Sequence, residues 1–312
     1  MKMIVMNVWG RVLVAPVLLT ALLAAGCGTG GTPTAAAGDK LQVVTAFYPF
    51  AYVASRVAGE HAEVSSLTQP GAEPHDVELT PRQVASVTTA DLVVYEHTFQ
   101  AAVDEAVAQS GNPRVLDTAT VVPLVPLATP VGEEHEAGTG LDPHVWLDPL
   151  NEAAIGDAVA ARLAAADPAH AADYSANAAA LRHDLTGLDS AYRTGLARCA
   201  RTEFVTTHAA FGYLARRYGL TQVGISGLSP DAEPSPERIA QVQQQIRADG
   251  LTTIFYETLV SPAVARSISG DLGLAADVLD PIEGITEQSR GADYLAVMRS
   301  NLAALTKANG CR

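Results

Sequence analysis

Residues 168–198 read PAHAADYSANAAALRHDLTGLDSAYRTGLAR, and large apolar side chains recur through them at the spacing of one helical face. A helix of about 30 residues reaches roughly 45 Å at 1.5 Å per residue, which is longer than one small lobe needs. We therefore interpret residues 167–198 as a long linking helix between two lobes. Its apolar stripe consists of Leu181, Leu185, Leu188, Tyr192 and Leu196.

Short apolar runs and helical patterns alternate on both sides of this helix, over residues 41–166 and 199–312. Alternation of this kind predicts an α/β fold with mostly parallel sheets and helices on their faces. We expect one lobe from each of the two segments. The predicted strands cover residues 41–47, 62–67, 92–95, 115–117, 203–207, 221–225, 252–256 and 276–279.

The first 26 residues have the pattern of a secretion signal. Basic residues precede an apolar run over residues 12–23, and small residues precede Cys27. The run is shorter than the roughly 20 residues of a membrane span, which favours a cleaved signal. The segment resembles a bacterial lipoprotein signal with Cys27 as the lipid acceptor, the alternative being a secreted protein with a free Cys27. Residues 27–40 are rich in Gly, Thr and Ala and are interpreted as a flexible tether.

The charge of the chain excludes some classes of partner. Its formal net charge is −14 at pH 7, and 48% of its residues are hydrophobic against 17% charged. The low charged fraction indicates a well-packed globular protein over most of the chain. The negative balance makes nucleic acid and anionic lipid headgroups poor partners.

Two further cysteines remain once Cys27 is assigned to lipid. Cys199 and Cys311 are a possible disulfide pair in an oxidising compartment. Two free buried thiols or a metal-binding pair are the alternatives. A disulfide closing a loop of roughly 110 residues would contribute a few kcal/mol, mostly by restricting the unfolded chain.

Four residues have the side chains of a zinc site. His75, His144 and His208 each follow a predicted strand or lie in a proline-restricted loop, and Asp280 follows the last predicted strand. Side chains at the carboxyl ends of strands lie where open α/β sheets place their sites. Three imidazoles and one carboxylate suit tetrahedral zinc. The four are far apart in the chain, however, so no spacing by itself brings them together.

Four motifs extend this interpretation to a family. They are residues 74–81 (PHDVELTP), 142–149 (DPHVWLDP), 206–214 (TTHAAFGYL) and 227–236 (GLSPDAEPSP). In this order they resemble motifs of the zinc- and manganese-binding solute-binding proteins of ABC transporters. The resemblance runs from about Leu41 to the C-terminus.

The resemblance implies two pseudo-symmetric α/β lobes joined by one long rigid helix, with the metal in the cleft between them. It implies ligand roles for His75, His144, His208 and Asp280. A histidine as the third ligand goes with zinc in this family, whereas manganese-binding members tend to have glutamate there. Glu257 is expected to orient a ligand rather than to bind the metal.

The expected function is that of an extracytoplasmic zinc receptor, lipid-anchored to the cell membrane, that delivers Zn²⁺ to an ABC permease. We expect a monomer that is not an enzyme and binds no nucleic acid. Manganese is the less favoured metal, because imidazoles suit zinc better.

Two alternatives come from other classes of protein. A zinc hydrolase needs an open coordination position, which Asp280 would fill, and the chain has no His-Glu-x-x-His pattern. A surface adhesin is compatible with the sequence as an added role. His97 and His135 are interpreted as surface histidines, with a metal-collecting role as the alternative for His135.

Overall fold

The computed structural model describes residues 40–127 and 140–312. The expected signal, Cys27 and the tether up to residue 39 lie outside the described residues, as does His135. Within the described ranges, no helix is both long and apolar enough to cross a membrane. Residues 40–312 form one compact unit that is built around two four-stranded sheets.

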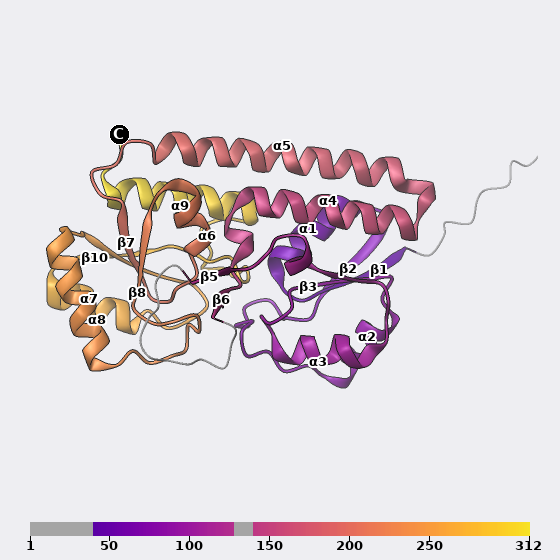
Figure 1. Ribbon diagram of the computed structural model, residues 1–312, viewed down its shortest axis with the longest axis horizontal. Helices are drawn as coiled ribbons and strands as arrows, with labels where there is room; N and C mark the ends of the chain where they lie inside the picture. The colour runs from indigo at the N-terminus through magenta and orange to yellow at the C-terminus, as the bar shows by residue number, and fades with distance from the viewer. Residues whose placement is uncertain (1–39, 128–139) are drawn as a thin grey trace, which may run out of the picture. The chain divides into compact units, whose positions relative to one another are not determined.

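The first sheet comes from residues that precede the long helix (Figure 1). In chain order its elements are β1 (Leu41–Thr45), α1 (Tyr48–Ala58), β2 (Ala62–Ser66), α2 (Pro81–Thr89), β3 (Leu92–Tyr95), α3 (Ala101–Ser110) and β4 (Val115–Asp117). All four strands run parallel, in the order β2-β1-β3-β4. Val43 and Val44 of the interior strand β1 are both buried, as expected for a parallel strand that is covered on both faces.

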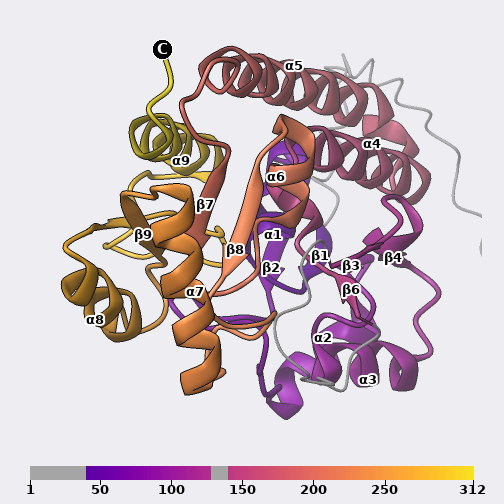
Figure 2. The ribbon, with the colours of Figure 1, turned by 60° about the vertical axis from the view of Figure 1, so that its left-hand side comes forward.

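The second sheet repeats this arrangement after the long helix (Figure 2). Its elements are β7 (Glu203–Thr206), α6 (Gly212–Tyr218), β8 (Thr221–Gly224), α7 (Pro236–Asp249), β9 (Thr253–Tyr256), α8 (Ala263–Leu272), β10 (Ala275–Val278) and α9 (Tyr294–Asn309). The strands are again parallel, in the order β10-β9-β7-β8. The expectation of two lobes with mostly parallel sheets is confirmed.

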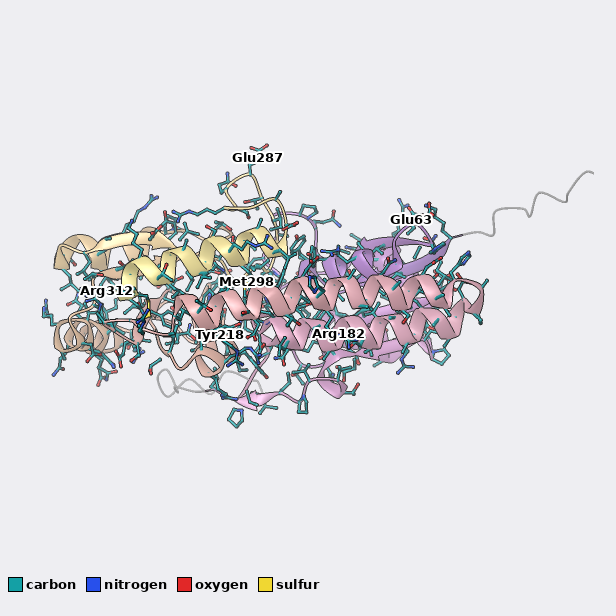
Figure 3. All side chains as sticks on the ribbon, turned by 90° about the horizontal axis from the view of Figure 1, so that it is seen from above. Glu63, Arg182, Tyr218, Glu287, Met298 and Arg312 are labelled. Carbon is teal, nitrogen blue, oxygen red and sulfur yellow. A yellow bond between two sulfur atoms is a disulfide. The ribbon has the colours of Figure 1, made fainter. Side chains whose placement is uncertain are left out.

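The observed linking helix is shorter than the predicted range, residues 167–198. A 3₁₀ turn, η3 (Pro168–His170), precedes α5 (Ala171–Gly195), whose 25 residues span about 37 Å. Helix α5 packs against α1 and α4 (Pro149–Ala166) of the first half and against α9 of the second (Figure 3). The five residues of the predicted stripe are all buried in the larger hydrophobic core, which draws side chains from both halves.

His144 lies between a short antiparallel strand pair and a 3₁₀ turn. The strands β5 (Val125–Pro126) and β6 (Leu141–Asp142) form an antiparallel pair that the sequence did not predict, followed by the 3₁₀ turn η2 (Val145–Leu147). Helix α4 has a capped N-terminus: Asp148 is the N-cap, its carboxylate accepts from the Leu150 N–H, and Pro149 is the first helical residue.

Cys199 and Cys311 form a disulfide in the structure. It joins the segment after α5 to the segment after α9.

The two sheets and α5 agree with the general arrangement of two lobes and a linking helix. The boundaries at residues 166 and 199 stay a prediction, because residues 40–312 form one compact unit.

Candidate metal centre

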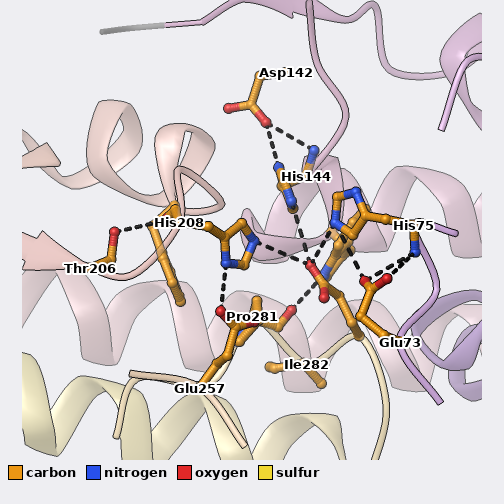
Figure 4. Close-up of polar contacts among 12 residues, drawn as sticks. Glu73, His75, Asp142, His144, Thr206, His208, Glu257, Pro281 and Ile282 are labelled. Atoms are coloured by element: carbon orange, nitrogen blue, oxygen red, sulfur yellow. Dashed lines mark hydrogen bonds and ion pairs between the residues drawn. The ribbon is translucent and has the colours of Figure 1, made fainter. Parts of the chain in front are cut away.

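Four side chains from four separate loops converge on one point, namely those of His75, His144, His208 and Glu283. Figure 4 shows the imidazoles of the three histidines gathered around this point. Each offers one ligand atom, and these atoms all lie within 4.8 Å of one another. Glu283 Oε1 lies 3.4 Å from Nε2 of His75, 3.4 Å from Nε2 of His144 and 3.6 Å from Nε2 of His208. The structure therefore brings together the three histidines that the sequence suggested.

These separations match the dimensions of a tetrahedral zinc site. With ligand atoms about 2.1 Å from the ion, two ligand atoms of a tetrahedron lie about 3.4 Å apart. The three measured N···O separations are 3.4 to 3.6 Å. The buried Nε2 atoms of His144 and His208 and the buried Oε2 of Glu283 have no hydrogen-bond partner among the described residues. Buried polar atoms without partners are costly, and coordination of an ion would satisfy them.

His144 is fully buried and is held at two atoms by one carboxylate oxygen. Asp142 Oδ1 accepts from the His144 Nδ1–H at 2.9 Å and from its backbone N–H at 3.0 Å. The bond to Nδ1 leaves Nε2 to face the ligand point. Gly212 makes room for this carboxylate, because a Cβ there would lie 2.2 Å from Asp142 Oδ2. The role of Asp142 was not recognised from the sequence.

His208 has the same arrangement with a different partner. Its Nδ1 lies 2.7 Å from Glu257 Oε1, which also accepts from the Thr207 hydroxyl at 3.1 Å. Both the imidazole and the Glu257 side chain are almost fully buried. Glu257 thus contacts the ligand imidazole from behind, where an orienting residue would lie.

His75 is the most accessible of the three imidazoles, with 11% of its side chain exposed. It lies in the turn-rich loop between β2 and α2. The Glu73 carboxylate accepts from the His75 backbone N–H at 3.0 Å, and the Phe99 ring packs edge-on against the imidazole. Glu73 therefore fixes the backbone at His75, and its Oε1 also lies 3.9 Å from the ring Nε2.

The charges in the cluster shift two imidazole pKa values upward. Burial disfavours the charged form of His208, but the charge of Glu257 and its hydrogen bond outweigh burial and raise the pKa to about 10. Burial likewise opposes protonation of His144, but the hydrogen bond to Asp142 and the nearby Glu283 carboxylate raise its pKa. For Glu283, burial favours the neutral acid, but the charge of His75 and the nearby imidazoles of His144 and His208 hold the pKa well below its usual value.

The fourth member of the cluster is Glu283, whereas the sequence suggested Asp280. Asp280 is 1% exposed and does not belong to the ligand group that the described residues form. Its Oδ1 accepts from the Ile282 N–H at 2.8 Å, and its Oδ2 accepts from the Thr258 hydroxyl at 2.9 Å. Both oxygens of Asp280 therefore accept hydrogen bonds, Oδ1 within its own loop and Oδ2 from Thr258 of the loop after β9. A second carboxylate three residues later in the same loop was the available signal for Glu283.

Two other residues, His97 and Arg217, make ion pairs outside the ligand cluster. His97 is exposed over 59% of its side chain and pairs with Asp104 at 3.3 Å, away from the cluster, in agreement with a surface role. Arg217 is only 16% exposed and lies 2.7 Å from Asp189 of α5 and 3.1 Å from the N-cap residue Asp148. Arg217 therefore connects α6, α5 and the start of α4.

The chain is similar in sequence and in structure to proteins of one family. Residues 43–308 match the family described as ZnuA, zinc-uptake complex component A, periplasmic. The chain is 37% identical over 287 residues to the zinc-binding lipoprotein AdcA of Streptococcus pneumoniae, an alignment that covers 86% of this chain and 56% of AdcA. It therefore spans little more than half the length of that relative.

Two further comparisons cover nearly the whole length of the similar protein. The chain is 34% identical over 300 residues to the high-affinity zinc uptake system protein ZnuA of Bacillus subtilis, covering 91% of this chain and 93% of that protein. The crystal structure of the Zn(II)-bound ZnuA-like domain of Streptococcus pneumoniae AdcA has a TM-score of 0.73 and 36% identity, covering 86% of this chain and 99% of that domain. The two-lobed fold is thus shared with a zinc-bound structure.

Proposed function

The chain belongs to the ZnuA family of zinc-uptake complex components, and on this premise we propose that it is an extracytoplasmic receptor that binds Zn²⁺ and delivers it to an ABC permease. The observation that carries this proposal is the convergence of three Nε2 atoms on one buried carboxylate oxygen at tetrahedral spacing. The ligands would be His75, His144, His208 and Glu283. The site is complete within one chain, which supports a monomeric receptor.

The ligand set favours zinc over manganese and binding over catalysis. Three imidazole nitrogens suit zinc, whereas manganese prefers oxygen ligands. A catalytic zinc keeps a position open for water, and the Glu283 carboxylate would occupy that position here. The protein would therefore carry the ion as cargo, and the free energy of binding would come from coordination.

Equilibrium titration with Zn²⁺ tests the binding step. We expect submicromolar affinity for the parent and a large loss for His208→Ala, which removes one of the proposed ligands. His97→Ala is the matched control, because His97 is an exposed histidine paired with Asp104 outside the cluster. Equal affinity of His208→Ala and the parent would remove the basis of the proposed site.

Growth under zinc limitation tests the delivery step. A strain lacking this protein should grow poorly when zinc is chelated, and the parental gene should restore growth. A gene carrying His208→Ala should not restore it, while one carrying His97→Ala should. Normal growth of the deletion strain in medium with chelated zinc would argue against a role in uptake.

Zinc binding should strengthen with rising pH because the imidazoles must lose protons to bind the ion. With its pKa raised to about 10, His208 is protonated in the metal-free protein at neutral pH, so zinc has to displace that proton. One displaced proton corresponds to about a tenfold gain in affinity per pH unit below that pKa. The number released is measured by calorimetry at pH 7 in buffers of different ionisation enthalpy.

The control for proton release is Glu257→Gln, which removes the charge that raises the His208 pKa. This variant should release fewer protons on zinc binding at pH 7 than the parent. Heats that do not depend on the buffer, for parent and variant alike, would show that no proton is displaced.

We also propose that Cys27 carries a lipid that holds the receptor at the membrane surface. The support is the signal-like sequence that precedes it, together with the similarity to proteins named lipoproteins. In cells, the parent should partition with membranes and enter the detergent phase of a Triton X-114 extraction. Cys27→Ser should appear in the aqueous phase, and an equal distribution of the two proteins would contradict the anchor.

A further inference from the structure

The turn that carries Glu283 has an unusual backbone. Ile282, which directly precedes Glu283, has φ +61°, in the left-handed region. That region is unfavourable for L-residues and most of all for β-branched ones, whose Cβ crowds the backbone. Ile282 is also fully buried in the larger core. Such a conformation persists only when surrounding contacts fix it.

Asp280 supplies the first of these contacts from within the turn. Its Oδ1 accepts from the Ile282 N–H at 2.8 Å, at the residue with the left-handed backbone. Asp280 is itself fixed by Asn301 of α9, whose amide accepts from the Asp280 N–H at 3.0 Å and donates to the Asp280 carbonyl at 2.7 Å. The Thr258 hydroxyl donates to the other carboxylate oxygen at 2.9 Å. Asp280 is thus the fixed base on which the turn is built.

Trp146 supplies the second contact, from the other half of the chain. Its Nε1–H donates to the Pro281 carbonyl at 2.7 Å, and its own carbonyl accepts from the Tyr294 hydroxyl at 2.6 Å. Trp146 follows His144 by two residues, and the centroids of the two rings lie 5.1 Å apart. One side chain therefore joins the turn of Glu283 to the segment that carries His144.

We propose that Asp280 is a positioning residue that, together with Trp146, holds the turn at Ile282 so that Glu283 reaches all three imidazoles. This inference rests on the proposed function, because it concerns how the zinc site is formed. A ligand held in place before the ion arrives needs no reordering on binding, so its contacts contribute fully to affinity. Asp280 then affects the ion through Glu283 and does not touch it.

Paired substitutions at Asp280 separate positioning from ligation. Asp280→Asn keeps an oxygen that accepts from the Ile282 N–H, whereas Asp280→Ala removes it. We expect Asp280→Ala to weaken zinc binding by about 10- to 100-fold, the range for residues that orient metal ligands. Asp280→Asn should bind close to the parent. Asp277→Ala is the matched control, because Asp277 pairs with Arg290 outside the cluster.

The absorption spectrum of the Co²⁺-loaded protein provides a readout that general destabilisation would not change. Asp280→Ala should lose intensity in the bands of tetrahedral cobalt, and Asp280→Asn should keep the parental spectrum. Should Asp280→Ala fail to fold, Trp146→Phe replaces it, since that change removes the Nε1–H donor to Pro281. It should likewise weaken zinc binding and alter the cobalt bands, and parental behaviour would overturn the proposal.

Three other results would overturn the inference. Parental affinity and cobalt spectrum in Asp280→Ala, with only a lower melting temperature, would make Asp280 merely structural. Equal losses of zinc affinity in Asp280→Asn and Asp280→Ala would indicate that the charged Asp280 carboxylate binds the ion directly. Absence of zinc binding by the parent would overturn the proposed function and this inference with it, whereas the first two results leave the proposed function intact.

Discussion

Glu283→Ala is expected to weaken zinc binding by about 100-fold or more, because a direct ligand should matter at least as much as the residues that orient ligands. Its Oε1 lies 3.4 to 3.6 Å from the Nε2 atoms of all three histidines. Without it, three imidazoles would face the ion with no negative charge among its direct ligands. Competition with a chelator of known zinc affinity measures the loss.

Two further variants define what Glu283 contributes. Glu283→Gln keeps the shape of the side chain and removes its charge, so it should lose most of the affinity that Glu283→Ala loses. Glu287→Ala is the matched control, since Glu287 is exposed in the same loop and points away from the protein (Figure 3). Parental zinc binding by Glu283→Ala would exclude Glu283 as a ligand and would favour Asp280 as the fourth ligand.

Removing the Cys199–Cys311 disulfide is expected to lower the free energy of unfolding by about 2–5 kcal/mol. The bond closes a loop with a sequence separation of 112, so it restricts a large part of the unfolded chain. It also joins the segments that follow α5 and α9, two helices that pack together. Chemical denaturation of a variant with serine at both positions measures the change.

Thiol counting in a Cys27→Ser background checks the disulfide directly. Only Cys199 and Cys311 remain in that variant, so the denatured protein should show no titratable thiol before reduction and two after it. Cys27→Ser alone should unfold like the parent and thereby serves as the stability control. Two titratable thiols without reductant would contradict the bond.

The regular elements of the fold could be predicted from local sequence patterns. The stripe from Leu181 to Leu196 predicted the long helix, because a helix that packs on one face repeats its apolar residues every three or four positions. The predicted strand at residues 115–117 also agrees with the structure. The pair β5 and β6 was missed, because two-residue strands carry almost no periodic signal.

The candidate site could be predicted only in part, for a reason that lies in one turn. Asp280 and Glu283 are both carboxylates after the last strand, and the sequence favoured the first. Which of them faces the histidines depends on the left-handed backbone of Ile282, a conformation that a β-branched residue gives no reason to expect. The ion pairs of Arg217 could not be predicted for a related reason, because its partners Asp189 and Asp148 are distant in sequence.

Metal analysis of the purified protein, followed by competition between Zn²⁺ and Mn²⁺, tests the zinc assignment most directly. We predict one tightly held zinc per chain, which an excess of Mn²⁺ does not displace, because three imidazole ligands favour zinc. Ready displacement of zinc by manganese, or a protein that binds neither ion at submicromolar concentration, would contradict the assignment of a zinc receptor.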